Sequence, residues 1–193
     1  VLGVKVPGGV SGLVDTLTAD AVLLSKDGDD VVGTVNAGAD EVFRVSVDAD
    51  TGVVTLTQSR SVVHDDTSDP NETGASAARL SAADLITLTA TITDGDGDTE
   101  TATADIGQAF AFEDDGPTIS RNVATIPTLV TDDTEIPDID VSVGTSFADL
   151  FTSDFGKDGF KDADDNDTED LDAIAYVLGV KVPGGVSGLV DTL

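Results

Sequence analysis

The sequence predicts an all-β fold, a β-sandwich with at most one short helix, and two patterns in the 193-residue chain carry this prediction. Apolar and polar residues alternate with a period of two over several short segments, as in strands that place one face on a core. Turn-forming dipeptides such as Asp-Gly and Pro-Gly separate these segments. Helical periodicity is confined to one place, described below.

The first expected strand covers residues 1–6 and ends at a Pro7-Gly8 turn. Residues 43–47 alternate cleanly between apolar and polar side chains, and residues 53–57 form the returning strand. Residues 48–52 connect them, and we expect Asp48 and Asp50 to form only a turn. A polar loop follows at residues 65–74.

The clearest strand covers residues 85–93, where aliphatic residues share one face and threonines the other. The expected inward face consists of Ile86, Leu88, Ala90 and Ile92. A turn at residues 94–98 leads to a partner strand whose expected inward residues are Ala102, Ala104 and Ile106. Small alanines opposite larger aliphatic residues are typical of a sandwich interior.

A new alternation begins at residues 118–126, and the helical periodicity lies further on. Residues 146–149 resemble a helix N-terminus, because Phe147, Leu150 and Phe151 follow at the spacing of one helix face. We expect one short helix there.

Residues 1–17 recur without a change as residues 177–193, an offset of 177 − 1 = 176 residues. An unchanged repeat predicts one full period of a tandem array plus a short overlap. The acidic Gly-Pro segment at residues 113–117 marks the expected boundary between the rear part of one unit (residues 1–112) and the front part of the next (residues 118–193). The strand of residues 1–6 is expected again at 177–182. Adjacent repeats are the expected partners, and in this chain a neighbouring copy could complete the sandwich head to tail.

The chain carries 38 acidic and 9 basic residues, a formal net charge of −29. This charge argues against nucleic-acid binding, which needs Lys and Arg partners for phosphates. The 39% of hydrophobic residues argues against disorder. Because the acids crowd into short loops, bound cations are the expected counter-charge. The absence of Cys excludes disulfides, and no apolar run approaches the ~20 residues of a membrane helix, so no membrane insertion is expected.

Asp94, Asp96 and Asp98 place three carboxylates at a spacing of two, with glycines between them. Ca²⁺ takes six to eight oxygen ligands, and such a loop supplies several from one short stretch. The alternative is a solvated hairpin turn, because Asp-Gly is a common turn pair.

A second acidic cluster consists of Glu113, Asp114 and Asp115. It follows Asp98 by 113 − 98 = 15 residues, which span roughly 45–50 Å when extended. The linker therefore should not reach the Asp94–Asp98 loop of its own domain, and we expect it to share a calcium ion with the loop of the following domain. A flexible acidic linker is the alternative.

Weaker calcium candidates are Asp132 with Asp133, and a set comprising Asp158, Asp162, Asp164 and Asn166. The second set opens like an EF-hand loop. It has Asp167 where that loop needs glycine and Ala173 where it needs glutamate, which excludes an EF-hand but leaves another calcium site open.

An enzyme is not expected. His64 is the sole histidine, lies in a polar loop and is expected to be a surface residue, which leaves one possible base for a catalytic triad. The segment Gly9-Val10-Ser11-Gly12-Leu13 lacks the final glycine of a nucleophile elbow. Aromatic residues that could line a sugar subsite of a glycosidase are scarce.

Residues 85–99 together with 112–117 resemble the repeats of giant type I-secreted RTX adhesins, and residues 129–134 and 154–159 are similar to further segments of those repeats. The resemblance implies an immunoglobulin-like β-sandwich, Ca²⁺ within and between domains, and a secreted location on the bacterial cell surface. It also implies the role of an extender that projects a distal adhesive domain in biofilm formation. The glycine pattern of residues 8–12 departs from the RTX nonapeptide, so no β-roll is expected. The alternative is an adhesive domain that itself binds a carbohydrate or a surface.

Overall fold

The computed structural model describes residues 1–66, 68–134, 139–162 and 168–190. The chain divides into two compact units, residues 1–158 and residues 159–193. Within the described residues, no helix has the length and apolar character needed to cross a membrane.

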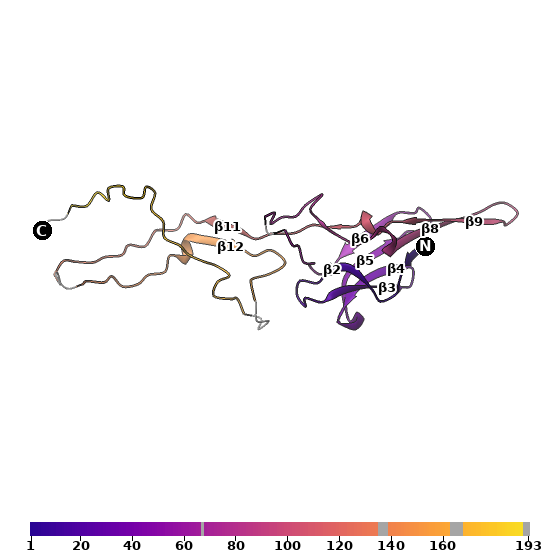
Figure 1. Ribbon diagram of the computed structural model, residues 1–193, viewed down its shortest axis with the longest axis horizontal. Coiled ribbons are helices and arrows are strands. Elements are labelled where there is room, and N and C mark those ends of the chain that lie inside the picture. Colours follow the sequence, from indigo (N-terminus) through magenta and orange to yellow (C-terminus); the bar gives the residue numbers. More distant parts are fainter. Residues whose placement is uncertain (67, 135–138, 163–167, 191–193) are drawn as a thin grey trace. The chain divides into compact units, whose positions relative to one another are not determined.

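A five-stranded antiparallel sheet forms the larger layer of the first unit (Figure 1). Its strands follow one another in chain order: β2 (Gly9–Val14), β3 (Ala21–Asp27), β4 (Asp30–Val35), β5 (Asp40–Val47) and β6 (Val54–Gln58). The predicted pairing of the two strands around residues 48–52 is confirmed, since Val45 lies opposite Leu56. Asp48 forms the expected turn by accepting hydrogen bonds from the backbone N–H groups of Asp50 and Thr51, at 3.0 and 2.9 Å.

A three-stranded antiparallel sheet forms the second layer, in the order β1 (Leu2–Val4), β8 (Ile86–Thr93) and β9 (Thr99–Asp105). A two-stranded ladder joins β7 (Ala78–Arg79) to β10 (Ala111–Phe112). Between the strands of these sheets lie single 3₁₀ turns, which include η1 (Asn36–Gly38), η2 (Ala83–Leu85) and η3 (Gly107–Ala109).

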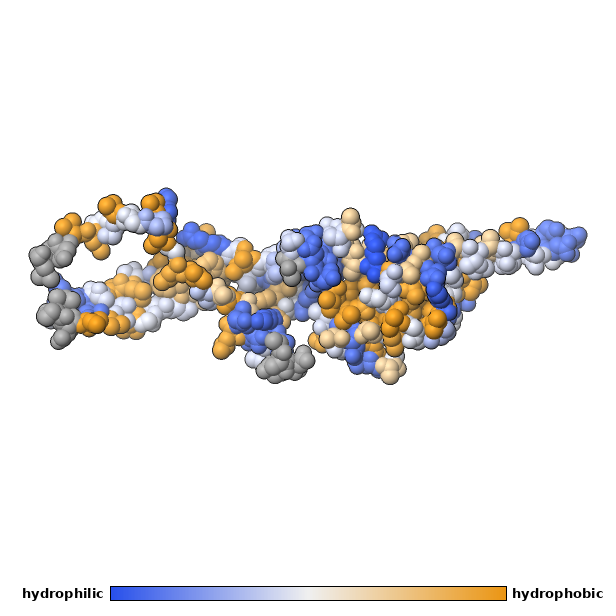
Figure 2. All heavy atoms as spheres, in the orientation of Figure 1, coloured by the Kyte–Doolittle hydropathy of each residue, from blue (hydrophilic) through white to orange (hydrophobic). Residues whose placement is uncertain are grey.

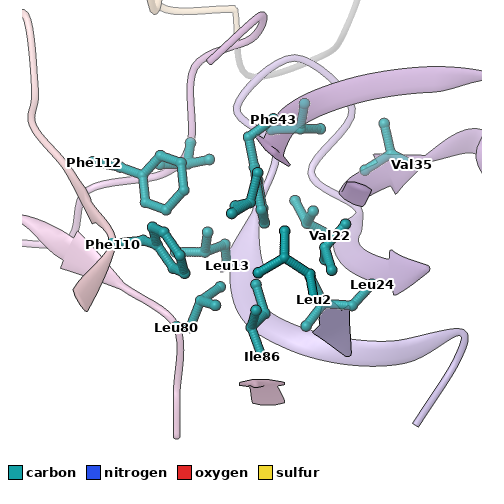
Figure 3. Packing of buried hydrophobic residues seen from close by; sticks show 14 residues of the cluster. Leu2, Leu13, Val22, Leu24, Val35, Phe43, Leu80, Ile86, Phe110 and Phe112 are labelled. Atoms are coloured by element: carbon teal, nitrogen blue, oxygen red, sulfur yellow. The ribbon is translucent and has the colours of Figure 1, made fainter. Parts of the chain in front are cut away.

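The hydrophobic core lies between these layers and draws side chains from both (Figure 3). Leu2 and Ile86 come from the smaller sheet, whereas Leu24 and Phe43 come from the larger one, and all four are at most 2% exposed. Phe112 packs on Phe43 with 5.1 Å between ring centroids and an interplanar angle of 56°, a tilted arrangement that aromatic pairs favour. The predicted all-β sandwich is confirmed.

The expected inward face of the β8–β9 ribbon is wrong over its outer half. Ile86 is buried, but Ile92 is 71% exposed, and Ala102 and Ala104 are exposed as well. The reason is that the ribbon extends beyond the sandwich, where no second layer covers it, and its tip is hydrophilic (Figures 1 and 2). Threonines pair across the outer ribbon in register: Thr89 with Thr103, Thr91 with Thr101 and Thr93 with Thr99.

Of the alternating segment at residues 118–126, only the first four residues form a strand. β11 (Thr118–Arg121) pairs antiparallel with β12 (Phe151–Asp154), and both strands are exposed. The expected short helix is only a single 3₁₀ turn, η4 (Ala148–Leu150), because the chain enters β12 directly after it.

The second unit contains no strand or helix among its described residues, so the predicted strand at 177–182 is wrong. Its sequence is identical to that of β1 and its surroundings, but Leu178 is fully exposed whereas Leu2 is 2% exposed. Leu2 lies opposite Leu88 of β8, and in the part of the chain that is described no strand pairs with the second copy. A strand sequence without a pairing partner does not form a strand.

Candidate metal sites

Two groups of side chains in the described residues bring one potential metal-ligand atom from each member within 4.8 Å of one another. One group is Asp94, Asp96 and Asp98, and the other is His64, Asp114 and Asp158. The structure therefore contains acidic groups that could hold metal ions.

The Asp94 group occupies the turn between β8 and β9, and all three of its residues are exposed. Asp94 Oδ1 accepts hydrogen bonds from the backbone N–H groups of Gly97 and Asp98, at 3.1 and 2.9 Å. Gly97 adopts a φ of +99°, in a region that glycine tolerates readily. These bonds close the turn around one carboxylate oxygen of the group.

The pKa of Asp94 is held below its ordinary value, chiefly by a hydrogen bond with the Asp96 side chain and then by the Asp98 backbone N–H. A lowered pKa keeps this carboxylate ionised under weakly acidic conditions, the form that binds a hard cation. The carboxylate oxygens gathered in this one turn can thus serve as ligands for such a cation.

The His64 group is assembled by the register of the β11–β12 ladder. Thr118 lies opposite Asp154, so paired positions sum to 118 + 154 = 272. Asp114 and Asp158 sum to the same value, 114 + 158 = 272, and would face each other if the antiparallel ladder continued by four residues. The ladder thus brings together two acids that are 44 residues apart in the sequence (158 − 114).

His64 reaches this pair from the loop that precedes β7. Its Nε2 lies 3.0 Å from the carbonyl oxygen of Phe112, and its side chain is only 5% exposed. The expectation that His64 is a surface residue is therefore wrong. Phe112 belongs to the core, so the hydrogen bond to its carbonyl fixes the imidazole at the edge of the sandwich.

A cleft of about 510 Å³ surrounds this group. Its lining includes five acidic residues and, besides His64, two basic ones. The acids are Asp15, Glu113, Asp114, Asp115 and Asp158, and the bases are Arg60 and Lys157. With His64 neutral the formal charge is 2 − 5 = −3, which attracts cations.

Two glycines let the linker approach its neighbours closely. A Cβ added to Gly116 would lie 1.6 Å from the carbonyl oxygen of Pro70, and one added to Gly156 would lie 1.8 Å from that of Asp115. Both contacts are shorter than any side chain could accept, so glycine is required for the backbones to meet. These approaches hold the linker against the His64 loop and against the segment that carries Asp158.

The other predicted ligands are placed separately. Glu113 Oε1 accepts a hydrogen bond from the Gly74 N–H at 2.9 Å. Asp115 lines the cleft, and its N–H donates to Asp114 Oδ1 at 2.8 Å. Asp132 Oδ1 accepts from the Thr134 N–H at 2.9 Å, which lowers its pKa, and neither Asp132 nor the exposed Asp133 joins a metal-ligand group among the described residues.

The proposed set around Asp158 is divided. Asp158 ends the first unit and Asp162 belongs to the second, while Asp164, Asn166 and Asp167 lie outside the described residues. Sequence reasoning placed Asp114 and Asp158 in different sites and missed His64. The only available signal was that His64 is the sole histidine of a very acidic chain; its partners depend on a strand register that local sequence does not specify.

Comparison with known proteins places the sandwich in a family. No curated protein and no solved structure shows significant similarity to the chain. A family described as a domain of unknown function (DUF5801) matches residues 1–107, more than half of the chain. The match includes His64 and the Asp94 turn but ends before Asp114 and Asp158. The chain belongs to the DUF5801 family.

Proposed function

We propose that this protein is a structural extender, one unit of a tandem array in a secreted bacterial surface adhesin, and that Ca²⁺ stiffens the array. The observation that carries the proposal is that two segments of identical sequence differ in burial. Leu2 and Leu13 of the first copy are 2% and 4% exposed, whereas the equivalent Leu178 and Leu189 are exposed almost completely. In a tandem array the second copy would also be buried, because the following unit would cover it as the first copy is covered here.

Two local hydrogen bonds of the first copy also form in the second, which supports this role. The Gly9 N–H donates to the Val6 carbonyl at 2.8 Å, and the Gly185 N–H donates to the Val182 carbonyl at 2.9 Å. Further along, the backbone N–H groups of Leu13 and Leu189 donate to serine hydroxyls, of Ser11 and Ser187, at 3.0 and 3.1 Å. Within the described residues the second copy has no paired strand, and residues 18–158 of a further unit would supply its strand partners.

Calcium is the ion we assign to the Asp94 turn, because that group offers oxygen ligands alone. The net charge of −29 supports a requirement for cations, since it opposes compaction. Ions that bind only the folded state stabilise it by about 2.7 kcal/mol per site at a hundredfold excess over Kd. For extracellular sites Kd is roughly 10⁻⁴–10⁻³ M. The sites would therefore be empty before secretion and occupied outside the cell, where bound Ca²⁺ would raise the stability of the folded state. Glu113 and Asp115 of the linker are further oxygen ligands for an ion between units.

The experiment that tests this proposal uses a chain with two tandem repeats, called the two-unit chain below. It consists of residues 1–193 followed by residues 18–158 of the same sequence. Thermal unfolding and small-angle scattering are measured with Ca²⁺, with Mg²⁺ as a divalent control, and with chelator. We expect Ca²⁺ to raise the midpoint of thermal unfolding and to increase the maximum dimension of the particle measured by scattering. Equal midpoints and equal dimensions in Ca²⁺ and in chelator would reject the calcium-stiffened extender.

A second candidate function is direct adhesion to a carbohydrate or solid surface, and the threonine pairs of the outer β8–β9 ribbon favour it. Thr89 Oγ1 lies 2.8 Å from Thr103 Oγ1, and the pairs beyond it are exposed. A regular row of hydroxyl and methyl groups suits a flat ligand. Binding of the chain to glycan arrays and mineral surfaces, compared with a Thr91→Lys/Thr101→Lys variant, separates adhesion from a purely structural role.

A further inference from the structure

We infer that His64, Asp114 and Asp158 form a binding site for a divalent cation of the Zn²⁺ class, separate from the oxygen-only Asp94 turn. The inference does not rest on the extender role. Its basis is a buried imidazole nitrogen that faces two carboxylates and has no hydrogen-bond partner in the part of the chain that the structure describes.

The protonation of the ring follows from its contacts. Nε2 lies 3.0 Å from the Phe112 carbonyl oxygen. A carbonyl can only accept a hydrogen bond, so Nε2 must carry the proton and donate it. On a neutral ring Nδ1 then presents its lone pair, the usual arrangement of a metal-binding histidine, whose other nitrogen donates to a carbonyl or carboxylate.

The surroundings of Nδ1 are electrostatically unfavourable for an unprotonated nitrogen that binds nothing. Nδ1 is buried without a hydrogen-bond partner among the described residues, and Asp114 Oδ1 lies 3.6 Å away, beyond hydrogen-bond range. A lone pair that faces a carboxylate is repelled by it, so the space between them favours a positive charge. That charge is either a second proton on the ring or a cation held by both groups.

The spacing fits a cation. Two ligands at about 2.0–2.2 Å from a tetrahedral Zn²⁺ lie about 3.3–3.6 Å apart, which includes the observed 3.6 Å. All three ligand atoms lie within 4.8 Å of one another, so each could reach one ion with small side-chain adjustments. One nitrogen and two carboxylate ligands, with the remaining position open to water from the cleft, suit Zn²⁺ and similar metals better than Ca²⁺, which prefers oxygen.

Neighbouring groups orient the two carboxylate ligands, and no Lys or Arg side chain forms an ion pair with either of them within the described residues. Thr16 Oγ1 donates to Asp158 Oδ1 at 3.3 Å, and the Asp115 N–H donates to Asp114 Oδ1 at 2.8 Å. Of the two basic residues in the cleft, Arg60 is engaged by Asp15. Lys157 makes no ion pair within the described residues.

The test uses the full 193-residue chain and the fact that His64 is its only histidine, so the ring resonances report this site alone. With Zn²⁺ added in excess Mg²⁺, we expect the ring signals to move to a new position and to stop changing beyond one equivalent of Zn²⁺. Ca²⁺ at the same concentration should leave them unchanged. Ring signals that do not move when Zn²⁺ is added, or that respond equally to Ca²⁺, overturn the inference.

Variants provide a second measurement, by competition for Zn²⁺ with a chromophoric chelator. Asp114→Asn and Asp158→Asn should each weaken the tight site at least about tenfold, and His64→Gln should abolish it. Asp29→Asn, the same chemical change in the exposed β3–β4 turn, is the matched control and should leave affinity unchanged. Equal affinity in all four variants contradicts the site. Failure of calcium to stiffen the two-unit chain would reject the extender and leave this result untouched.

Discussion

The guanidinium of Arg60 binds both carboxylate oxygens of Asp15. Arg60 Nε donates to Oδ1 at 2.8 Å and Nη2 donates to Oδ2 at 2.7 Å. The Asp15 side chain is fully buried, and that of Arg60 is 22% exposed. This two-point geometry is the strongest form of an ion pair. It fixes the end of β2 to the segment that follows β6, where residues 58–61 line the cleft.

Replacing Asp15 by Asn should destabilise the first unit by roughly 3–5 kcal/mol, because Arg60 loses its charged partner in a largely buried position. The pKa of Asp15 is lowered by the Arg60 hydrogen bond first and by Thr18 next. A carboxyl group with a lowered folded pKa contributes stability above its unfolded pKa, about 3.9. That contribution is lost as the pH falls through the folded value.

Urea unfolding of the native chain and of Asp15→Asn from pH 7 to pH 2.5 measures this effect. The difference in unfolding free energy should be constant above about pH 5 and should shrink below about pH 4. The other acids change the absolute stability of both proteins alike, so the difference isolates Asp15. A difference that grows on acidification contradicts the assignment.

Leu13→Ala and Leu189→Ala are the same change in the same seventeen-residue sequence, with opposite expected results. Leu13 is 4% exposed, so its truncation should cost about 2–5 kcal/mol. Leu189 is 87% exposed, so its truncation should leave the unfolding free energy of this chain within about 0.5 kcal/mol. Chemical denaturation of both variants measures this, and a comparable loss at both positions would show that the second copy is buried in solution.

Gly116→Ala should weaken Zn²⁺ binding without altering a ligand, because the new Cβ collides with the Pro70 carbonyl and displaces the linker that carries Asp114. Gly144→Ala is the control, since a Cβ there meets nothing within 4 Å. Chelator competition on both variants should show a loss of about tenfold or more for the first and none for the second. Unchanged affinity in Gly116→Ala would mean that the linker does not position the site.

Asp96→Asn should reduce the calcium-induced rise of the unfolding midpoint, because it removes a charged ligand from the Asp94 turn. The midpoint in chelator should stay the same or rise, since the change also relieves repulsion among three carboxylates. Calorimetry with and without Ca²⁺ measures both, with Asp29→Asn as the control. A full calcium response in Asp96→Asn would assign calcium binding to other residues.

The sequence pattern predicted the parts of the fold whose cause is local. Alternation and turn residues placed β5, β6 and the turn at Asp48, and the Pro-Gly turn forms in both copies of the repeat. What the pattern could not predict depends on distant partners. Ile92 has a strand pattern that no second layer covers, and residues 177–182 have a strand sequence without a paired strand. The Asp94 turn was visible because its carboxylates are adjacent in sequence, whereas the His64 group depends on the β11–β12 register.

The tandem role is tested most directly by hydrogen–deuterium exchange on the two-unit chain described above. Peptides that span residues 171–190 are distinguishable from the first copy by their flanking residues. In the two-unit chain their amides should become as protected as those of β1 and β2, whereas in the 193-residue chain they should exchange at once. Rapid exchange of the second copy in both chains would contradict the claim that a following unit receives this segment as its first strands.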